Sequence, residues 1–579
     1  MIWNEYKFSV KKVIEALVAS WVGMLILSFY YSGTVLFNRE YSKNFSIVTA
    51  LILIVLLFLL IILLDMLIKS VEIVRLSLLL LVSMYMIIIV SFTSEITWLY
   101  AAVLIELLLV YYLRDTDFGI RIRDKYVFAK SSYAILFLLV LLFIGGYTVM
   151  KYLAYRSPNF DFGIFANMYH NMKEGFKPLV TSERDKVLSH FAVHFSPIVY
   201  VALPIYCVFP DPATVQVIQA LALAVGVIPI YLISKHHGLG KKTTVAIGIL
   251  YFLYPALAGG CAYDFHENCF LVPTLLFLFW AMEKKNNILI ILFGLLACMV
   301  KEDAPVYVAI IGIYYLCSGK SKLRGSLLTI ASVIYFVVVT SLMQKYGLGV
   351  MTYRYSNIVP YGVDGFGAII KAAMSNPMLL ISECFTAEKM QFAFYMLMPI
   401  AGLSFANKKV SNFILVGPFL LINLISDYQY QHSIFFQYTF GVTAIFFYLV
   451  IVNLKEMKPI MRRNCLRFAM VASLTIFVFI LPRYINYFNY YSIEKDKIEE
   501  LNEALEMIPD DASVSASTFL VAKLSEREFI YEYPSDNETE YIVLDHRWSK
   551  YSDVAIDNLK MRGYEVVYDG TNVLILKLK

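Results

Sequence analysis

Long apolar segments recur along this chain of 579 residues, and they constrain its fold more than any other feature. Residues 47–67 carry a single charged side chain, Asp65, and about 20 apolar residues is the length that an α-helix needs to cross a bilayer. Similar segments occupy residues 13–31, 78–91, 98–113 and 133–154. Because 59% of the residues are hydrophobic and 16% are charged, a soluble globular fold is excluded. The sequence predicts a polytopic α-helical membrane protein with about 13 transmembrane helices.

The net charge and the cysteines exclude several classes of function. The net charge of +5 is small for this length, so nothing indicates a nucleic-acid partner. The seven cysteines are scattered without a C-x-x-C pair, which argues against a thiolate metal site or a disulfide framework. The first apolar segment follows Lys11 and Lys12, and no small-residue cleavage site comes after it. A cleaved signal peptide is therefore not expected.

Basic residues between the apolar segments predict which loops are cytoplasmic. They form three N-terminal clusters: Lys7, Lys11 and Lys12; Lys69 and Arg75; and Arg114, Arg121, Arg123, Lys125 and Lys130. By the positive-inside rule the N-terminus is cytoplasmic and the fifth segment leads to the outer face. The basic loops 320–324, 408–409 and 455–467 order the rest of the chain in the same way. This topology places the residues after about 484 outside the cell membrane.

One apolar segment, Phe191 to Phe209, does not fit this alternation, because both of its ends are expected outside. It contains Pro197 and Pro204, and proline interrupts the helical hydrogen bonds that a bilayer requires. We interpret it as a re-entrant or juxtamembrane segment. The alternative is that it crosses the membrane and that one of the weaker segments does not.

Carboxylates and imidazoles gather on the outer side of this topology, whereas the inner loops hold mainly lysine and arginine. The outer set is Asp161, His170, His190, His194, Asp264, His266, Glu267, Glu302, Asp303, Asp427 and His432. Ionisable groups at a membrane boundary are costly unless they are solvated, paired or coordinated, so this asymmetry predicts an outward-facing site. Asp161, which directly follows the fifth segment, is the candidate catalytic acid or base. The alternative is that it caps an interfacial helix.

The run Asp264-Phe265-His266-Glu267 offers two carboxylates and an imidazole where an apolar segment begins. In a helical turn Asp264 and Glu267 share a face, which suits a divalent cation or a general-base pair. The alternative is a hydrated helix cap. His190 and His194 also have a helical spacing, but the glutamate of an H-E-x-x-H zinc motif is absent, because Phe191 follows His190.

Lys301-Glu302-Asp303 and Tyr353-Arg354-Tyr355 offer cations at two other outer boundaries. Lysine serves as a phosphate-binding point charge, and an arginine between aromatic rings suits a phosphate beside a sugar or prenyl chain. The alternatives are a self-neutralising charge cluster for the first run and an interfacial tyrosine belt for the second, since aromatic residues make up 16% of the chain.

The hydropathy falls after Tyr484. Short segments with the composition of β-strands lie near residues 512–517, 528–532, 541–545, 564–568 and 573–576, and helical segments fall between some of them. This pattern predicts a small soluble α/β domain. It contains no phosphate loop or nucleotide fingerprint. The expected domains are a four-helix membrane extension at 1–130, a membrane core at 131–487 with outer loops 155–212 and 346–390, and the α/β domain at 488–579 outside.

From about Tyr133 to the C-terminus the chain resembles the membrane-protein family called domain of unknown function 2079. The motifs that carry this resemblance are Asp161-Phe162-Gly163, His194-Phe195-Ser196-Pro197, Pro204-Ile205-Tyr206, Asp264-Phe265-His266, Lys301-Glu302-Asp303, Asn423 with Ser426, and Ala516-Ser517 with Leu524-Ser525. The first four apolar segments look like an added N-terminal module.

That family in turn resembles the GT-C class of membrane glycosyltransferases, which take sugars from polyprenyl-phosphate carriers. The resemblance implies a catalytic aspartate at Asp161, a second acid at Asp264, and a lysine after a G-L-x-x-L type helix at Lys301. The chain departs from the class in two respects. It has no W-W-D sequence, and His266 and Glu302 have no assigned equivalent.

The resulting hypothesis is glycosyl transfer from a polyprenyl-phosphate sugar to an envelope glycan, lipid or protein acceptor on the outer face, with either inversion or retention. Its catalytic candidates are Asp161, Asp264, His266 and Glu267. Its substrate-binding candidates are Arg156, His194, Lys301, Glu302, Asp303 and Arg354. Asp161, Asp264 and Glu267 are also candidate ligands of a divalent cation. The alternatives are a transporter or lipid flippase, and a non-catalytic membrane assembly protein.

Overall fold

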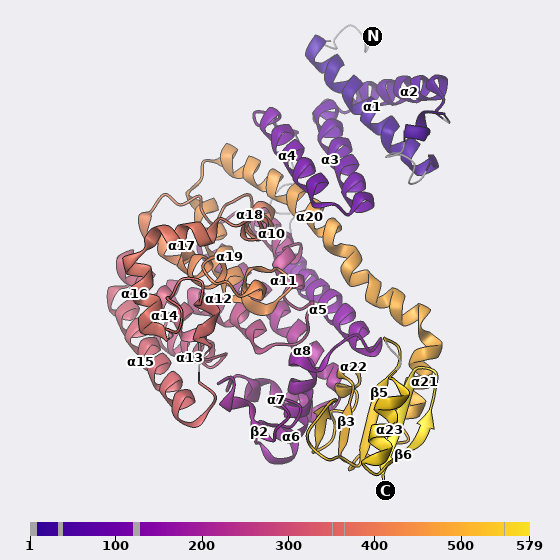
Figure 1. Cartoon of the computed structure of the whole chain (residues 1–579). Coiled ribbons are helices and arrows are strands. Elements are labelled where there is room, and N and C mark those ends of the chain that lie inside the picture. The colour runs from indigo at the N-terminus through magenta and orange to yellow at the C-terminus, as the bar shows by residue number, and fades with distance from the viewer. Residues whose placement is uncertain are drawn as a thin grey trace.

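The computed structural model describes residues 9–32, 39–43, 45–119, 128–349, 351–363, 365–548 and 551–579. Lys7, Arg121, Arg123 and Lys125, which the sequence places in cytoplasmic clusters, lie outside the described residues. The chain is mostly helical, and Figure 1 shows a five-stranded sheet at the C-terminal end and a short two-stranded hairpin apart from it.

The N-terminal segments form four helices: α1 (Val10–Ser32), α2 (Ile47–Leu67), α3 (Ile73–Thr93) and α4 (Ile96–Tyr112). α1 packs on α2 and α3, and buried charges join them, because Arg75 Nε lies 3.2 Å from Glu15 Oε2. α3 and α4 then pack on α20 (Pro459–Ile493), which Figure 1 shows as a long orange helix running from these helices to the C-terminal domain.

The membrane core follows with shorter helices. They are α5 (Ala129–Leu153), α6 (Ile164–Gly175), α7 (Val199–Val208), α8 (Pro212–Val225), α9 (Val227–His236), α10 (Lys241–Phe252), α11 (Pro255–Gly259), α12 (Leu271–Glu283), α13 (Asn287–Cys298), α14 (Ala304–Cys317), α15 (Lys322–Tyr346), α16 (Phe366–Ser375), α17 (Pro377–Cys384), α18 (Ala387–Leu397) and α19 (Phe440–Glu456). Local capping sets several boundaries, since Asp211 accepts from the backbone N–H of Ala213 at the start of α8. α19 lies at the centre, with nearly every residue buried.

Within the described residues, nine helical segments are long and apolar enough to cross a membrane. They are Val10–Phe29, Ile47–Leu67, Ile73–Thr93, Ala129–Leu153, Pro212–His236, Lys241–Gly259, Lys322–Tyr346, Gln437–Glu456 and Pro459–Ile493. Other apolar helices, such as α4, α13 and α14, fall below that length. The prediction of several apolar helices long enough to cross a membrane is therefore confirmed. The count of about 13 transmembrane helices stays a prediction.

The polar groups sort to the two ends of the core, as the alternation of loops requires. Glu267 precedes α12, and Glu283 ends it. Around Glu283 gather groups from loops expected to be cytoplasmic, with Lys320 Nζ at 2.9 Å and His237 Nε2 at 3.8 Å. From the expected outer loops, His194, His266 and Lys301 gather instead around Glu267. Because α12 separates the two clusters, they lie on opposite sides of the core.

The segment from Phe191 to Phe209 forms only one α-helix, α7, which has ten residues. At a rise of about 1.5 Å per residue it is roughly 15 Å long, half of what a hydrocarbon core requires. This length agrees with a re-entrant or juxtamembrane segment.

The C-terminal domain is a five-stranded mixed sheet with helices. Its strands are β3 (Val514–Ala516), β4 (Ile530–Glu532), β5 (Tyr541–Asp545), β6 (Tyr564–Asp569) and β7 (Val573–Leu578), and its helices are α21 (Lys495–Leu505), α22 (Thr518–Val521) and α23 (Asp553–Met561). The strand order is β4-β3-β5-β7-β6, with β3 parallel to both neighbours and β7 antiparallel to both of its own. The five strands expected from the sequence are thus present.

This domain packs against the loop that follows α5. Tyr155 joins the hydrophobic core of the domain, and its hydroxyl donates to Asn502 Oδ1 at 2.7 Å. Arg156 Nη2 donates to both carboxylate oxygens of Glu494 at 2.8 Å. In Figure 1 the domain lies at the same end of the core as α6, α7 and the short hairpin of β1 (Leu179–Val180) and β2 (Leu188–Ser189).

Candidate functional site

Asp161 lies in a distorted turn, Asn159–Gly163, between α5 and α6. Its backbone has φ 63° and ψ −70°, a strained conformation for a residue with a side chain. The side chain is half-buried, and among the described residues its only hydrogen-bond donor is Gln437 Nε2, 3.4 Å from Oδ2. Burial, reinforced by the charge of Glu267, raises the pKa of Asp161 to about 6. Within the described residues no backbone N–H donates to this carboxylate, which argues against a helix cap.

Asp264 is buried and fully hydrogen-bonded. Lys151 Nζ lies 2.7 Å from Oδ2, while Ser157 Oγ and Gln216 Nε2 donate to Oδ1 at 2.9 and 2.8 Å. The carboxylate thus joins α5, the following loop and α8. Burial raises the pKa of Asp264 to about 6 even though Lys151 opposes the shift. Since its oxygens are occupied, this geometry favours a structural role over the predicted catalytic one.

His266 and Glu267 are adjacent and buried, at 3% and 0% exposed. The backbone N–H of Asn268 lies 3.2 Å from His266 Nδ1. Burial lowers the pKa of His266, which favours the neutral ring. Glu267 Oε2 lies 3.0 Å from the same nitrogen and has no hydrogen-bond donor within the described structure.

Lys301 is buried beside Glu267, with 3.6 Å between Nζ and Oε1. No acceptor in the described part of the chain forms a hydrogen bond with this ammonium. Burial lowers the pKa of Lys301, but Glu267 and Glu302 outweigh it and hold the pKa above its usual range. An ammonium that is buried and lacks an acceptor is poised to receive an anionic ligand.

Glu302 and Asp303 differ in how their carboxylates are used. His194 Nδ1 lies 3.0 Å from Glu302 Oε1, and the backbone N–H of Phe195 donates to Oε2 at 3.1 Å. Burial opposes ionisation of Glu302, but His194 prevails and lowers its pKa to about 2. Asp303 makes no side-chain hydrogen bond to any described residue, and burial raises its pKa. Glu302 therefore orients His194, whereas the Asp303 carboxylate remains available.

Arg354 is the second cation of the site. Its guanidinium lies 4.5 Å from the Tyr428 ring centroid and 5.1 Å from that of Tyr438, and it donates to the Tyr438 hydroxyl at 3.3 Å. It forms no ion pair with a carboxylate among the described residues, and its Nε has no acceptor there. The tyrosine rings hold the guanidinium in place without neutralising it.

A cavity of about 460 Å³ begins at these cations and extends among apolar side chains. Its polar end contains His194, Lys301, Glu302, Asp303 and Arg354. Its walls come from α14, α15, α16, α17 and the segment after Phe419, with Val306, Phe336, Phe366, Ile370, Leu380 and Leu421 among them. An apolar space suits an amphiphile with an anionic head when it ends in an ammonium without a hydrogen-bond acceptor, Lys301, and a guanidinium that pairs with no carboxylate of the described residues, Arg354.

The structure brings together most of the predicted site residues but not all. The charges of Glu267, Lys301 and His194 all act on Asp161, so these groups lie near one another. Arg156 lies elsewhere, because it bonds Glu494 and stacks on Tyr490 and Trp548, with its Cζ at 4.4 and 4.6 Å from the ring centroids.

The set of cation ligands expected from the sequence, Asp161, Asp264 and Glu267, stays a prediction. No three His, Cys, Asp or Glu side chains within the described residues converge as metal ligands. The physical reason is that Asp264 turns away from the site toward Lys151. Sequence reasoning also missed Gln437 and Tyr438, which reach the site from the short turn before α19 and carry no local sequence signal.

Comparisons with known proteins identify a family and one similar structure. The family described as predicted membrane protein (DUF2079) matches residues 151–575. A crystal structure of ArnT from Cupriavidus metallidurans bound to undecaprenyl phosphate aligns with 77% of this chain and 98% of its own, at 11% sequence identity and a TM-score of 0.47. No curated protein matches the sequence.

Proposed function

We propose that this chain, which belongs to the DUF2079 family of predicted membrane proteins, transfers a sugar from a polyprenyl-phosphate carrier to an acceptor in the cell envelope. The observation that carries the proposal is the apolar cavity that ends at Lys301 and Arg354. The prenyl chain fills the apolar part, and the phosphate meets the two cations. A soluble nucleotide sugar needs neither the length nor the apolarity of this cavity.

Asp161 is the proposed general base. An acceptor hydroxyl attacks the anomeric carbon of the sugar, its proton passes to the Asp161 carboxylate, and the bond between that carbon and the phosphate oxygen breaks. The electron pair leaves with the phosphate, whose charge Lys301 and Arg354 stabilise. A carboxylate with a pKa raised to about 6 is a stronger base than an ordinary aspartate and is still ionised near neutral pH.

His194 and Asp303 complete the proposed site. Glu302 holds His194 at the polar end of the cavity, where its free ring nitrogen is available to the sugar or the phosphate. Asp303 has a carboxylate available for sugar hydroxyls. In this proposal the site and the C-terminal domain face out of the cell, and the N-terminus faces the cytoplasm.

The test uses the purified full chain in detergent or nanodiscs with radiolabelled undecaprenyl-phosphate sugars and, in parallel, nucleotide sugars. Loss of sugar from the lipid, to an added envelope extract or slowly to water, supports the proposal when Asp161→Asn abolishes it. Robust turnover of a nucleotide sugar with none of any lipid-linked sugar would contradict it. Movement of the lipid across the bilayer without cleavage would instead support the flippase alternative.

A further inference from the structure

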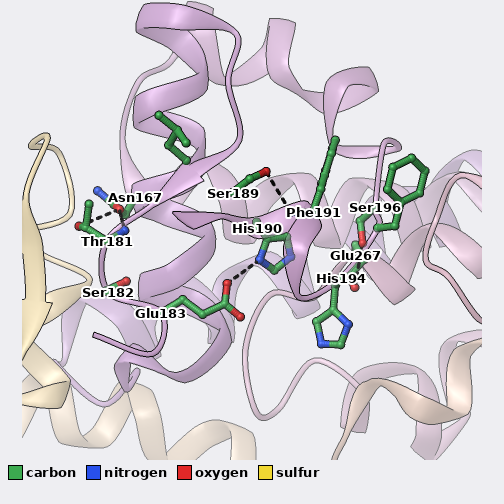
Figure 2. Close-up of polar contacts among 12 residues, drawn as sticks. Asn167, Thr181, Ser182, Glu183, Ser189, His190, Phe191, His194, Ser196 and Glu267 are labelled. Atoms are coloured by element: carbon green, nitrogen blue, oxygen red, sulfur yellow. Dashed lines mark hydrogen bonds and ion pairs between the residues drawn. The ribbon is translucent and has the colours of Figure 1, made fainter. Parts of the chain in front are cut away.

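A second carboxylate–imidazole pair, Glu183 with His190, lies beside the site and takes no part in the function described so far. Glu183 Oε2 is 3.0 Å from His190 Nδ1, and the side chains are 9% and 3% exposed. Glu183 lies in the loop between β1 and β2, and His190 directly follows β2. Figure 2 shows the His190 ring between Glu183 on one side and His194 and Glu267 on the other.

The other ring nitrogen of His190 has no partner. Nε2 is buried and makes no hydrogen bond to any described residue. The ring is held edge-to-face against Phe165, at 4.9 Å between centroids, and lies 5.9 Å from the His194 ring. A buried ring N–H without an acceptor is unfavourable, so a ligand that supplies an acceptor is favoured at this position.

We propose that His190, oriented and kept cationic by Glu183, donates its Nε2–H to the phosphate headgroup of the lipid ligand. It thereby joins Lys301 and Arg354 as a third donor to the anion. This inference rests on the proposed function, because the lipid is the one that the cavity is proposed to hold. It assigns a substrate-binding role to a histidine that the cavity lining does not include.

The charges around His190 support a cationic ring. The groups that act on it are Glu183 and Glu267, which favour the charged form, and Lys301, which disfavours it; His194 and His266 lie farther along the same row of rings. Burial lowers the pKa of His190, but the adjacent Glu183 carboxylate outweighs it and the net pKa is raised. Lys301 Nζ lies 3.6 Å from Glu267, and His190 feels the charge of the same carboxylate. His190 Nε2 and Lys301 Nζ are both buried, and neither forms a hydrogen bond to a described residue.

The C-terminal domain fixes the position of Glu183. Thr181 Oγ1 donates to the carbonyl oxygen of Ile530 at 2.7 Å, and the N–H of Ile530 donates back at 2.9 Å. Asn159 Nδ2 bonds both the carbonyl oxygen of Ser182 and Glu532 Oε2. Strand β4 therefore holds the residues just before Glu183, which gives the domain a part in building the anion site.

The experiment measures binding to the purified full chain from about pH 6 to about pH 9, a range that spans ordinary histidine titration. The ligands are undecaprenyl phosphate, undecaprenol, which lacks the phosphate, and inorganic phosphate. The variants are His190→Gln, Glu183→Gln and, as a matched control, His170→Gln, whose histidine lies on α6 outside the site. Thermal unfolding of each variant checks that it folds.

We expect His190→Gln to weaken undecaprenyl phosphate binding about 10- to 100-fold at the acidic end, the scale of one charged hydrogen bond. The ratio of the variant to the wild-type dissociation constant should fall toward one as pH rises and the wild-type ring loses its proton. Taking the ratio at each pH removes the ionisation of the phosphate itself. Glu183→Gln should keep the ring orientation but shift the loss of affinity to lower pH.

The outcomes separate the inference from the proposed function. If the wild type binds undecaprenyl phosphate no better than undecaprenol, the lipid-phosphate function fails and the inference fails with it. If the wild type discriminates but His190→Gln binds like the wild type at every pH, or weakens undecaprenol equally, only the inference is overturned. Displacement of the lipid by micromolar inorganic phosphate would overturn the lipid as the source of the anion. If His190→Gln does not fold, an unshifted pH profile in Glu183→Gln overturns the inference by itself.

Discussion

Lys151 and Asp264 form a buried ion pair, with 2.7 Å between Nζ and Oδ2, that ties the end of α5 to the loop before α12. Lys151 also donates to the carbonyl oxygen of Ala262 at 3.2 Å. Two of the loops that carry the candidate site start near this pair, since Asp161 follows Lys151 and Glu267 follows Asp264. The pair is therefore part of the support of the site.

The first prediction concerns this support. Asp264→Asn leaves the Lys151 ammonium buried without a counter-charge, which typically costs about 3–5 kcal/mol. We expect a lower thermal unfolding temperature, with activity lost in proportion to folded protein. The double variant Lys151→Met with Asp264→Asn should regain most of the stability. A folded, fully stable Asp264→Asn protein without transfer activity would instead return Asp264 to the catalytic group.

The second prediction tests whether Asp161 has a catalytic role and not a structural one. Asp161→Asn should abolish lipid-linked sugar cleavage while the unfolding temperature at neutral pH stays equal or rises. The reason is that the native pKa of Asp161 is raised from 3.8 to about 6. Because the pKa is higher in the folded state, protonated Asp161 contributes to the free energy of unfolding. That contribution is complete below pH 3.8 and is lost as pH rises through about 6. The wild type at pH 7 thus carries an unfavourable buried charge that asparagine removes.

The same titration predicts a pH dependence for catalysis. A general base must be ionised, so the rate should rise with pH and level off above about 6. Single-turnover cleavage of the lipid-linked sugar, measured from about pH 5 to about pH 8, tests this. A rate that falls with rising pH over this range would show that Asp161 acts as an acid or that another group is the base.

The sequence predicted the helical membrane class, the C-terminal strands and the gathering of polar residues at one end. These depend on signals that lie within a few residues of each other, such as the apolar run at 47–67 and the short apolar run in β5. The sequence did not predict which carboxylates are left available for chemistry and which are occupied by hydrogen bonds. Asp161 and Asp264 look alike in sequence, and they differ only because Lys151, Ser157 and Gln216 surround one of them.

Long-range partners explain the remaining differences. Arg156 adjoins the site in sequence but bonds Glu494, more than three hundred residues later, so no local pattern reveals its role at the domain contact. Glu183 and His190 are brought together by a two-residue hairpin pairing that is too short to carry a strand signal. Lys151 was the accessible clue, because a lysine near the end of an apolar segment requires a partner.

The third prediction tests the phosphate end of the cavity. Arg354→Gln should raise the KM for the lipid-linked donor about tenfold or more and change kcat less, because a phosphate contact is made in both ground and transition states. Arg354 is a cleaner choice than Lys301, whose removal leaves the Glu267 carboxylate buried without its cation. Arg354→Lys should recover little, since the two tyrosine rings fit a planar guanidinium. An unchanged KM with a reduced kcat would contradict phosphate binding by Arg354.

The fourth prediction concerns the orientation of the core in the membrane. The structure places the site and the C-terminal domain at one end of α12 and the Glu283 cluster at the other, and the basic loops predict that the Glu283 end is cytoplasmic. Single cysteines should replace exposed residues in a cysteine-free background, because Cys207 and Cys317 are themselves exposed. We expect an impermeant thiol reagent added to intact cells to label cysteines at Lys177 and Glu538, and to label those at Lys241 and Lys455 only after the membrane is permeabilised.

The opposite result would be labelling of the cysteines at Lys241 and Lys455 in intact cells, with those at Lys177 and Glu538 protected. That result would invert the orientation. A site facing the cytoplasm would then meet nucleotide sugars directly, and the proposal of a lipid-linked donor at the outer face would lose its topological basis.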